Sequence, residues 1–205
     1  MTSDHDHLAA AVGTFSGLAA ADARRLAEAF SLREVGAREA VARPGSDRHE
    51  VLFVARGLLR FYYPGDDGAE ANKAFVAEGE FAGALAAATL GVPILYGIEA
   101  LELSTVLAVP VAELRARMDA EPALERFGRR LAERILARKE ARARSLMLQS
   151  ATERYLDFCA TRPDLVQRVP QHHIASLLSM TPVHLSRVRR ELACGGSSRG
   201  EGAPF

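Results

Sequence analysis

The sequence predicts an α+β protein, with a barrel or jelly roll of short strands in its first half and helices in its second half. Three observations support this prediction. Short alternating apolar segments separated by turns fill residues 32–109, and apolar residues at helical spacing follow over 122–148. Residues 171–192 then fit the pattern of a helix-turn-helix. A chain of 205 residues is long enough to bury a core of this kind.

The strands of the first half are bounded by frequent turns. A flexible segment over 1–13 and a helix over 14–30 are expected before them. Pro64-Gly65-Asp66-Asp67-Gly68 is typical of a hairpin turn between two strands. Many short strands with such turns favour an all-β barrel or jelly roll. The strands are expected at 32–35, 39–42, 51–55, 57–63, 71–76, 94–101 and 104–109, followed by a short helix over 111–118.

A long helix is predicted next, within a segment spanning 122–149. Leu124, Phe127, Leu131 and Ile135 recur on it at intervals of three and four residues. A stripe of this kind is typical of a two-stranded coiled coil, so these four residues predict the seam of a homodimer. The alternative is that the same stripe packs the helix on the barrel of its own chain.

The last folded part is predicted to span 150–192 and to begin at a capping box formed by Ser150 and Glu153. Within it, Ala175 provides the small residue at which the two motif helices cross. Ser179 occupies a turn position that is usually glycine in this motif. Thr181 is the expected N-cap of the second helix, with Pro182 as its first residue. The apolar positions of the motif are all filled, by Ile174, Leu178, Met180, Leu185 and Val188.

The outer face of the second motif helix is the predicted contact with double-stranded DNA. Residues 1–110 have a net charge of −6 and residues 111–205 a net charge of +6, counted from Lys, Arg, Asp and Glu, which favours a nucleic-acid-binding second half. The alternative is an ordinary helical hairpin in a globular core. Counted from Ala175, the residues expected to face DNA are Thr181, Pro182, Val183, Ser186, Arg187 and Arg190.

Several classes of protein are disfavoured by what the sequence lacks. Its two cysteines, Cys159 and Cys194, are far apart and give no zinc or iron–sulfur pattern. No Ser/His/Asp triad, acid/base pair or glycine-rich phosphate loop stands out, so we expect no enzyme activity, cofactor or metal. The N-terminus does not read as a signal peptide, and the uncharged run 81–98 is interrupted by glycine and proline. A cytoplasmic protein with no membrane partner is expected.

The order of these parts resembles the family of the cyclic AMP receptor protein and the fumarate–nitrate reduction regulator, the Crp–Fnr regulators. The resemblance covers about 12–192. It implies a cyclic-nucleotide-binding-type jelly-roll sensor domain over 14–121, a dimerisation helix over 122–149 and a helix-turn-helix domain over 150–192. A homodimeric transcription regulator follows from it, with Arg187 matching a base-reading arginine and RNA polymerase as a candidate partner. The matching motifs are Gly57-Leu-Leu-Arg60-Phe-Tyr-Tyr, Gly79-Glu80-Phe81 with Gly83, Ile98-Glu99-Ala100-Leu101-Glu102, and Glu153-Arg154-Tyr155.

The chain departs from this family pattern at the nucleotide phosphate. Gly79 and Glu80 match a motif whose glutamate bonds the ribose in nucleotide-binding relatives. Ile94 and Leu95 stand where those relatives have the phosphate-binding arginine and its hydroxyl neighbour. A buried phosphate without a cation is strongly disfavoured, so cyclic-nucleotide binding is expected to be lost and Glu80 to serve as a structural carboxylate. The vestigial pocket is expected at Gly79, Glu80, Phe81, Gly83, Ile94 and Leu95, and any effector stays open.

A second departure is at the C-terminus. Relatives often follow the recognition helix with a two-stranded wing. Here Glu191 and Leu192 run into a Gly/Ser-rich segment, so the wing is expected to be missing and 193–205 to be a disordered tail. The alternative function is a ligand-binding or protein-interaction module of the same fold, without sequence-specific DNA binding. In that case Arg187 and Arg190 would be dispensable.

Overall fold

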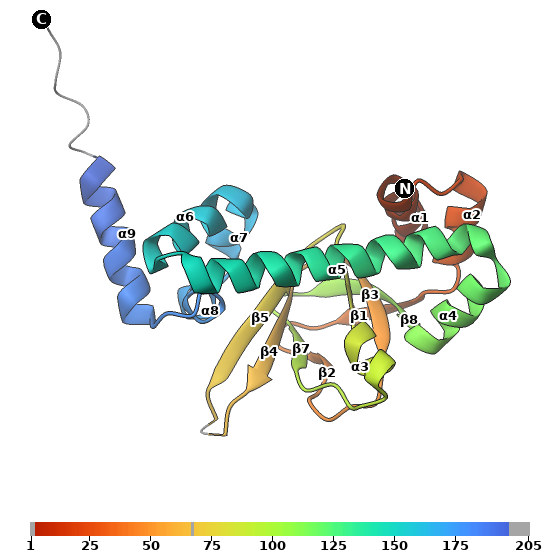
Figure 1. The fold of residues 1–205 in the computed structure, drawn as a ribbon, viewed down its shortest axis with the longest axis horizontal. Helices are drawn as coiled ribbons and strands as arrows, with labels where there is room; N and C mark the ends of the chain where they lie inside the picture. Colours follow the sequence, from red (N-terminus) through yellow and green to blue (C-terminus); the bar gives the residue numbers. More distant parts are fainter. Residues whose placement is uncertain (1–2, 67, 197–205) are drawn as a thin grey trace, which may run out of the picture. The chain divides into compact units, whose positions relative to one another are not determined.

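We describe the protein from a computed structural model, which covers residues 3–66 and 68–196. The chain divides into two compact units, Met1–Lys139 and Glu140–Phe205 (Figure 1). The first unit contains all the described strands, and the described part of the second unit, up to residue 196, contains helices and no strand. The α+β class is therefore confirmed, with strands first and helices afterwards.

Two four-stranded antiparallel sheets form the jelly roll of the first unit. One sheet has the order β1-β8-β3-β6 and the other the order β2-β7-β4-β5. Seven of these strands lie where the sequence predicts them, while β6 was not predicted. The bounds are β1 Ser31–Val35, β2 Ala40–Ala42, β3 Glu50–Arg56, β4 Leu59–Pro64, β5 Glu70–Val76, β6 Phe81–Gly83, β7 Gly97–Ala100 and β8 Ser104–Pro110.

The sheet that contains β3 and β8 is covered on both faces, which explains the nearly continuous apolar sequence of these two strands. Successive strand residues point to opposite faces. In β3, Leu52 and Val54 face the core between the sheets, whereas Val51, Phe53 and Ala55 face a second core beneath the helices. β8 alternates in the same way. The two cores are thus separated by a single sheet.

The N-terminal segment is helical, so the predicted flexible segment 1–13 and the single helix 14–30 are wrong. α1 spans Asp4–Ser16 and α2 spans Ala20–Ala27. Ser3 and Asp6 form a capping box that starts α1, and Gly17 ends it with φ of 71°. Leu8 and Val12 are fully buried, so α1 is fixed by packing as well as by its cap. The helix was not predicted because its apolar face consists mostly of alanine and contains few large apolar residues.

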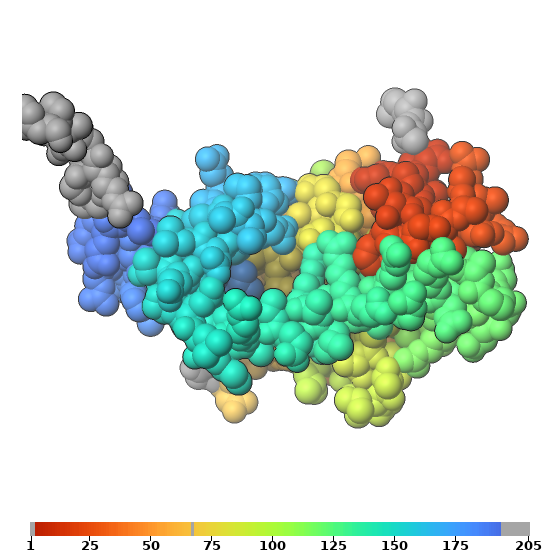
Figure 2. All heavy atoms as spheres, turned by 45° about the horizontal axis from the view of Figure 1, so that its top comes forward, coloured from red at the N-terminus to blue at the C-terminus, as the bar shows by residue number. Residues whose placement is uncertain are grey.

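The helix α5 spans Pro122–Leu148, as predicted, but its apolar stripe is not a dimer seam. Leu124, Phe127 and Leu131 are 0–1% exposed within the single chain, because they pack with α1, α2, β3 and β8. Ile135 is half-buried against the same core. Figure 2 shows α1 and α2, in red, lying against the first part of α5, in green. The alternative reading, packing on the chain's own barrel, is therefore correct.

Two short helices complete the first unit. α3 spans Leu85–Leu90 and was not predicted, whereas α4, Val111–Ala120, follows β8 at the predicted place. Gly128 on α5 lies where a β-carbon would approach Met118 Sδ at 2.2 Å, so glycine allows α4 and α5 to pack closely. No described helix is long and apolar enough to cross a membrane.

The second unit begins with the end of α5 and continues with four helices. The predicted capping box of Ser150 and Glu153 starts α6, Ala151–Thr161. α7, Pro163–Arg168, α8, Gln171–Leu177, and α9, Pro182–Gly196, follow. α9 continues past Leu192, so 193–196 is helical rather than part of a disordered tail, since Leu192 and Ala193 extend a good helical sequence. The remainder of the predicted tail, and any wing, lie outside the described residues.

Candidate functional site

The two helices α8 and α9 pack through the apolar residues of the motif. Ala175, the residue at the crossing, is fully buried. Met180 is half-buried, and the other four motif positions are each at most 8% exposed: Ile174, Leu178, Leu185 and Val188. The apolar side chains of the motif are therefore largely buried, and the face of α9 that carries Arg187 and Arg190 is left to solvent.

The turn between the helices has the geometry that its sequence predicts. Ser179 has φ of 54°, a left-handed conformation that glycine adopts more easily. Met180 N–H donates to the Ala175 carbonyl at 3.0 Å, which closes the turn. Thr181 Oγ1 accepts the His184 N–H at 3.1 Å, as expected of an N-cap residue. Pro182 then begins α9.

The six residues expected to face DNA lie together on one exposed surface, which we call the outer face of α9. All six are exposed, and Val183 is 81% exposed although it is apolar. With His184 they line a shallow hollow of ≈ 670 Å³. The members of the outer face are Thr181, Pro182, Val183, Ser186, Arg187 and Arg190.

Arg189 has a different role from its neighbours Arg187 and Arg190. It interacts with the side chain of Tyr155 on α6, as Cys159 does. Burial, and then Cys159, raise the pKa of Tyr155, while Arg189 acts in the opposite direction. Arg189 therefore ties α9 to α6 and does not line the outer face.

The residues of the predicted vestigial pocket are not brought together. Phe81 belongs to the core beneath the helices, with ring centroids 4.9 Å from Phe53 and 5.3 Å from Phe127. Ile94 belongs to the core between the sheets, where it is 1% exposed. Leu95 points outward and is 70% exposed. The prediction that these residues line one pocket is wrong, because Phe81 and Ile94 belong to different cores on the two faces of the sheet that contains β6.

The Glu80 carboxylate is engaged by a backbone amide and by an arginine. Its Oε2 accepts the Ala77 N–H at 2.9 Å, and its Oε1 forms an ion pair with Arg138 of α5 at 2.5 Å. Ala82 and Ala84, which follow Glu80 in the chain, are among the residues that share a core with Ile94. The expectation of a structural carboxylate agrees with these contacts. The ion pair with Arg138 was missed because the two residues are 58 positions apart.

Gly79 and Gly83 serve the backbone around β6. Gly79 has φ of 76°, which glycine tolerates at the turn before the strand. A β-carbon on Gly83 would meet Val51 Cγ2 at 3.3 Å and Glu50 O at 3.5 Å. These glycines therefore allow a tight turn and a close strand pairing, and they require no ligand.

Lys73 is a polar residue of the barrel that the sequence did not single out. Its Nζ lies 3.4 Å from the ring centroid of Tyr96 and 5.6 Å from that of Tyr63. Burial, together with the charge of Lys139, lowers the pKa of Lys73 to about 8. Among the described residues, no ion pair involves Lys73. It lies at the irregular register between β4 and β5, which the sequence pattern could not locate.

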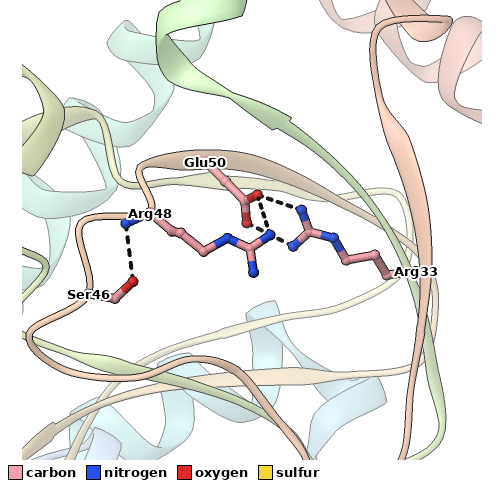
Figure 3. A network of polar contacts seen from close by, with 4 residues as sticks. All are labelled: Arg33, Ser46, Arg48 and Glu50. Atoms are coloured by element: carbon pink, nitrogen blue, oxygen red, sulfur yellow. Dashed lines mark hydrogen bonds and ion pairs between the residues drawn. The ribbon is translucent and has the colours of Figure 1, made fainter.

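A second polar group lies on the other sheet. The Glu50 carboxylate sits between the guanidinium groups of Arg33 and Arg48 (Figure 3). Arg33 bonds both carboxylate oxygens, at 2.5 and 2.9 Å, and Arg48 adds one bond at 3.2 Å. Burial alone would raise the pKa of Glu50, but these arginines outweigh it and lower the pKa. The group lines a hollow of ≈ 520 Å³ together with the start of α4.

The described residues include no group of three or more His, Cys, Asp or Glu side chains that could hold a metal ion. His172 and His173 are neighbours, with ring centroids 4.0 Å apart, but no third such side chain completes a site around them in the described part of the chain. The geometry therefore directs attention to the outer face of α9 and to the barrel.

Comparison with known proteins identifies the first unit. Residues 32–121 match the family described as the cyclic nucleotide-binding domain. This segment is similar to that family, and the chain has the fold seen in Crp–Fnr regulators. The fold that the predicted resemblance implies is confirmed. A search of curated proteins found no match to the chain.

Three solved structures illustrate the shared fold. FixK2 from Bradyrhizobium japonicum is 20% identical, with 85% of this chain and 89% of that chain covered and a TM-score of 0.71. The c-di-GMP-responsive global regulator CLP from Xanthomonas campestris is 20% identical over 90% and 96% of the two chains, with a TM-score of 0.67. The catabolite activator protein from Thermus thermophilus is 20% identical over 92% and 90%, with a TM-score of 0.56.

Proposed function

We propose that this protein is a homodimeric, sequence-specific DNA-binding transcription regulator whose barrel does not bind cyclic nucleotides. The observation that carries the proposal is the outer face of α9. Two arginines, three small or hydroxyl-bearing side chains and one exposed valine lie on it, and the apolar residues of the motif point away from it. A helix of this kind fits the major groove of DNA, with Arg187 donating to a guanine.

The barrel supports the negative part of the proposal. A cyclic nucleotide carries a phosphate charge that needs charged or multiple donors in a closed site. Ile94 is buried in the apolar core at the relevant place, and the Glu80 carboxylate is already paired with Arg138. The barrel then acts as a scaffold, or as the receptor of a different effector.

The dimer seam is proposed on the side of α5 that does not face the barrel. Ala132, Leu136, Ala143 and Met147 recur at intervals of four, seven and four residues along the helix. All four are exposed, with Leu136 at 60% and Met147 at 81%. Exposed large apolar side chains at coiled-coil spacing are typical of a helix that pairs with a second copy.

The substitution Arg187→Ala tests the DNA-binding part. Wild-type protein would first be used to select a preferred site from random duplex DNA. We expect Arg187→Ala to weaken binding to that site by about 1–3 kcal/mol and to relax the preference at one base position. Gel-shift titration at fixed salt measures both effects.

Arg144→Ala is the matched control, because it removes one exposed arginine from α5 and leaves the outer face of α9 intact. It should keep the base preference of the wild type. If the wild type selects no sequence at all, or if Arg187→Ala behaves like the control, the alternative of an interaction module without specific DNA binding is favoured.

A further inference from the structure

We propose that Arg142 and Arg154 are positioning residues that fix the direction of α9 by holding the carbonyl end of α8. Arg142 lies on α5 and Arg154 on α6, within the same compact unit as the helix-turn-helix. This inference rests on the proposed DNA binding, since it concerns how the recognition helix is presented. Neither arginine lines the outer face of α9.

The first observation is where the two guanidinium groups bind. Arg142 Nη1 donates to the Leu177 carbonyl at 2.8 Å, and Arg154 Nε donates to the Leu178 carbonyl at 2.9 Å. The last carbonyls of a helix have no partner within it, and they carry the negative end of the helix dipole. Two cations therefore cap α8 at consecutive residues, where a charged hydrogen bond is strongest.

The second observation is what lies on each side of this cap. Arg154 Nη1 also donates to the Gln149 carbonyl at 2.7 Å, directly after the end of α5. On the other side, Ser179 follows Leu178 at once with its left-handed φ, and α9 begins three residues later at Pro182. The two arginines thus join the end of α5 to the residues from which α9 departs.

The consequence is a direct mechanical connection between the helix that we propose to form the dimer and the helix that we propose to read DNA. A change in the end of α5 moves the Arg142 side chain and the Gln149 carbonyl, and both are tied to the last turn of α8. A merely structural pair of arginines would affect the melting temperature alone. A positioning pair also affects specific DNA binding under conditions where every variant is fully folded.

The test compares Arg142→Met and Arg154→Met with Arg144→Met in the full chain. Arg144 is exposed on the same helix as Arg142, so its replacement removes an equal charge without touching α8. We expect both test variants to bind the selected site at least about tenfold more weakly, the loss expected for a charged hydrogen bond. Binding to non-specific DNA should be unchanged, because phosphate contacts depend on total charge at the interface.

A second readout does not depend on DNA. Hydrogen exchange of the backbone amides over residues 179–187 should be faster in both test variants than in Arg144→Met. Arg142→Lys should restore much of the wild-type behaviour, because one donor suffices at Leu177. Arg154→Lys should not, because a lysine cannot bridge two carbonyls as the planar guanidinium does.

Test variants with the exchange rates and specific affinity of the control would overturn the positioning role. If Arg154→Met does not fold, the pair Arg142→Met and Arg142→Lys decides the question alone. A wild-type protein that selects no DNA sequence would refute the proposed function. The exchange measurement would in that case still support or overturn the tie between α5 and α9.

Discussion

The barrel and the helix-turn-helix both keep the apolar core of their fold, but they differ in what surrounds it. In the barrel, Ile94 fills the position where the resemblance implies a phosphate-binding arginine, and it is 1% exposed. In the helix-turn-helix, Arg187 and Arg190 remain exposed beside each other on the outer face of α9. The core residues determine the fold, whereas the polar residues outside the core determine what the fold binds.

This difference has an energetic reason. A cation in a closed barrel requires an anion or several acceptors, since an unpaired buried charge is costly. An isoleucine at the same place packs with Tyr96 and Ile98 in a core that needs no ligand. Arginines on an exposed helix face carry no such cost, because water solvates them until DNA replaces it. The barrel can therefore be stable when empty, and the outer face of α9 can carry its arginines without burying them.

The largest expected effect concerns the two sides of α5. Leu131→Asp should destabilise the first unit by at least about 3–5 kcal/mol, because it leaves an unpaired charge in a core where Leu131 is 1% exposed. Denaturant unfolding followed by circular dichroism measures this loss. Because the variant is expected to be partly unfolded, its oligomeric state does not report on the dimer seam.

Leu136→Asp tests the proposed seam without disturbing the barrel core, since Leu136 is 60% exposed in the single chain. It should fold like the wild type and sediment as a monomer. Leu148→Asp is its control, because Leu148 is 76% exposed but lies outside the proposed stripe. A folded, dimeric Leu136→Asp protein would show that the seam is elsewhere.

The next largest effect tests the proposal that the barrel, unlike the outer face of α9, has lost its ligand. Calorimetric titration with cyclic AMP or cyclic GMP should give no saturable binding at micromolar concentration. The missing charged hydrogen bonds are worth about 1.5–3 kcal/mol each, so losing one of them alone weakens binding by tenfold or more.

The substitution Lys73→Met shows which cation would hold the phosphate if a cyclic nucleotide did bind. Lys73 is the described barrel cation that lies over Tyr96, two residues after Ile94. Micromolar binding that disappears in Lys73→Met would contradict the proposal that the barrel does not bind cyclic nucleotides, and would assign the phosphate contact to Lys73. Micromolar binding that persists in Lys73→Met would also contradict it and would direct attention to the arginines of α5.

Sequence reasoning succeeded where the signal is local. The bounds of α5, the capping box at Ser150 and the unusual turn residue Ser179 all follow from neighbouring residues. It failed where the decisive partner is distant in the chain. A stripe at Leu124 and Leu131 shows that one helix face is apolar, but periodicity cannot say whether that face meets its own barrel or a second copy.

The polar contacts of the barrel were unpredictable for the same reason. Glu80 and Arg138 pair across 58 positions, and Lys73 lies over Tyr96 because the register between β4 and β5 is irregular. Neither contact leaves a pattern in the residues next to it. The capping box at Ser3 and Asp6 was different, since its signal is local and could have been recognised before the structure.

A smaller effect is expected at the turn of the helix-turn-helix. Ser179→Gly should stabilise the second unit by about 1 kcal/mol. A non-glycine residue in the left-handed region costs about 1–2 kcal/mol, and the larger chain entropy that glycine loses on folding offsets part of this gain. Thermal unfolding measures the change. Ser179→Ala is the control and should not stabilise the protein, so a gain in both variants would show that the backbone angle is not the cause.

The smallest effect concerns the titration of Lys73. Its pKa of about 8 in the folded protein lies below the usual 10.5, so the unfolded chain binds more protons between these two values. The contribution of Lys73 to the free energy of unfolding should therefore rise as the pH rises from about 8 to about 10.5. Tyrosines titrate at the upper end of this range, so the quantity to measure is the difference between the wild type and Lys73→Met.

Denaturant unfolding of the two proteins at several pH values gives that difference directly. Below pH 8, Lys73 is charged in both states and its burial cost is fully present, so Lys73→Met should be at least as stable as the wild type. Near pH 10.5, this cost has disappeared and the wild type gains relative to the variant. A difference that stays constant across the range would mean that the stacking of the ammonium group on Tyr96 fully offsets its burial. In that case Lys73 would have the same pKa in the folded and the unfolded chain, and an anionic effector would be favoured over an apolar one.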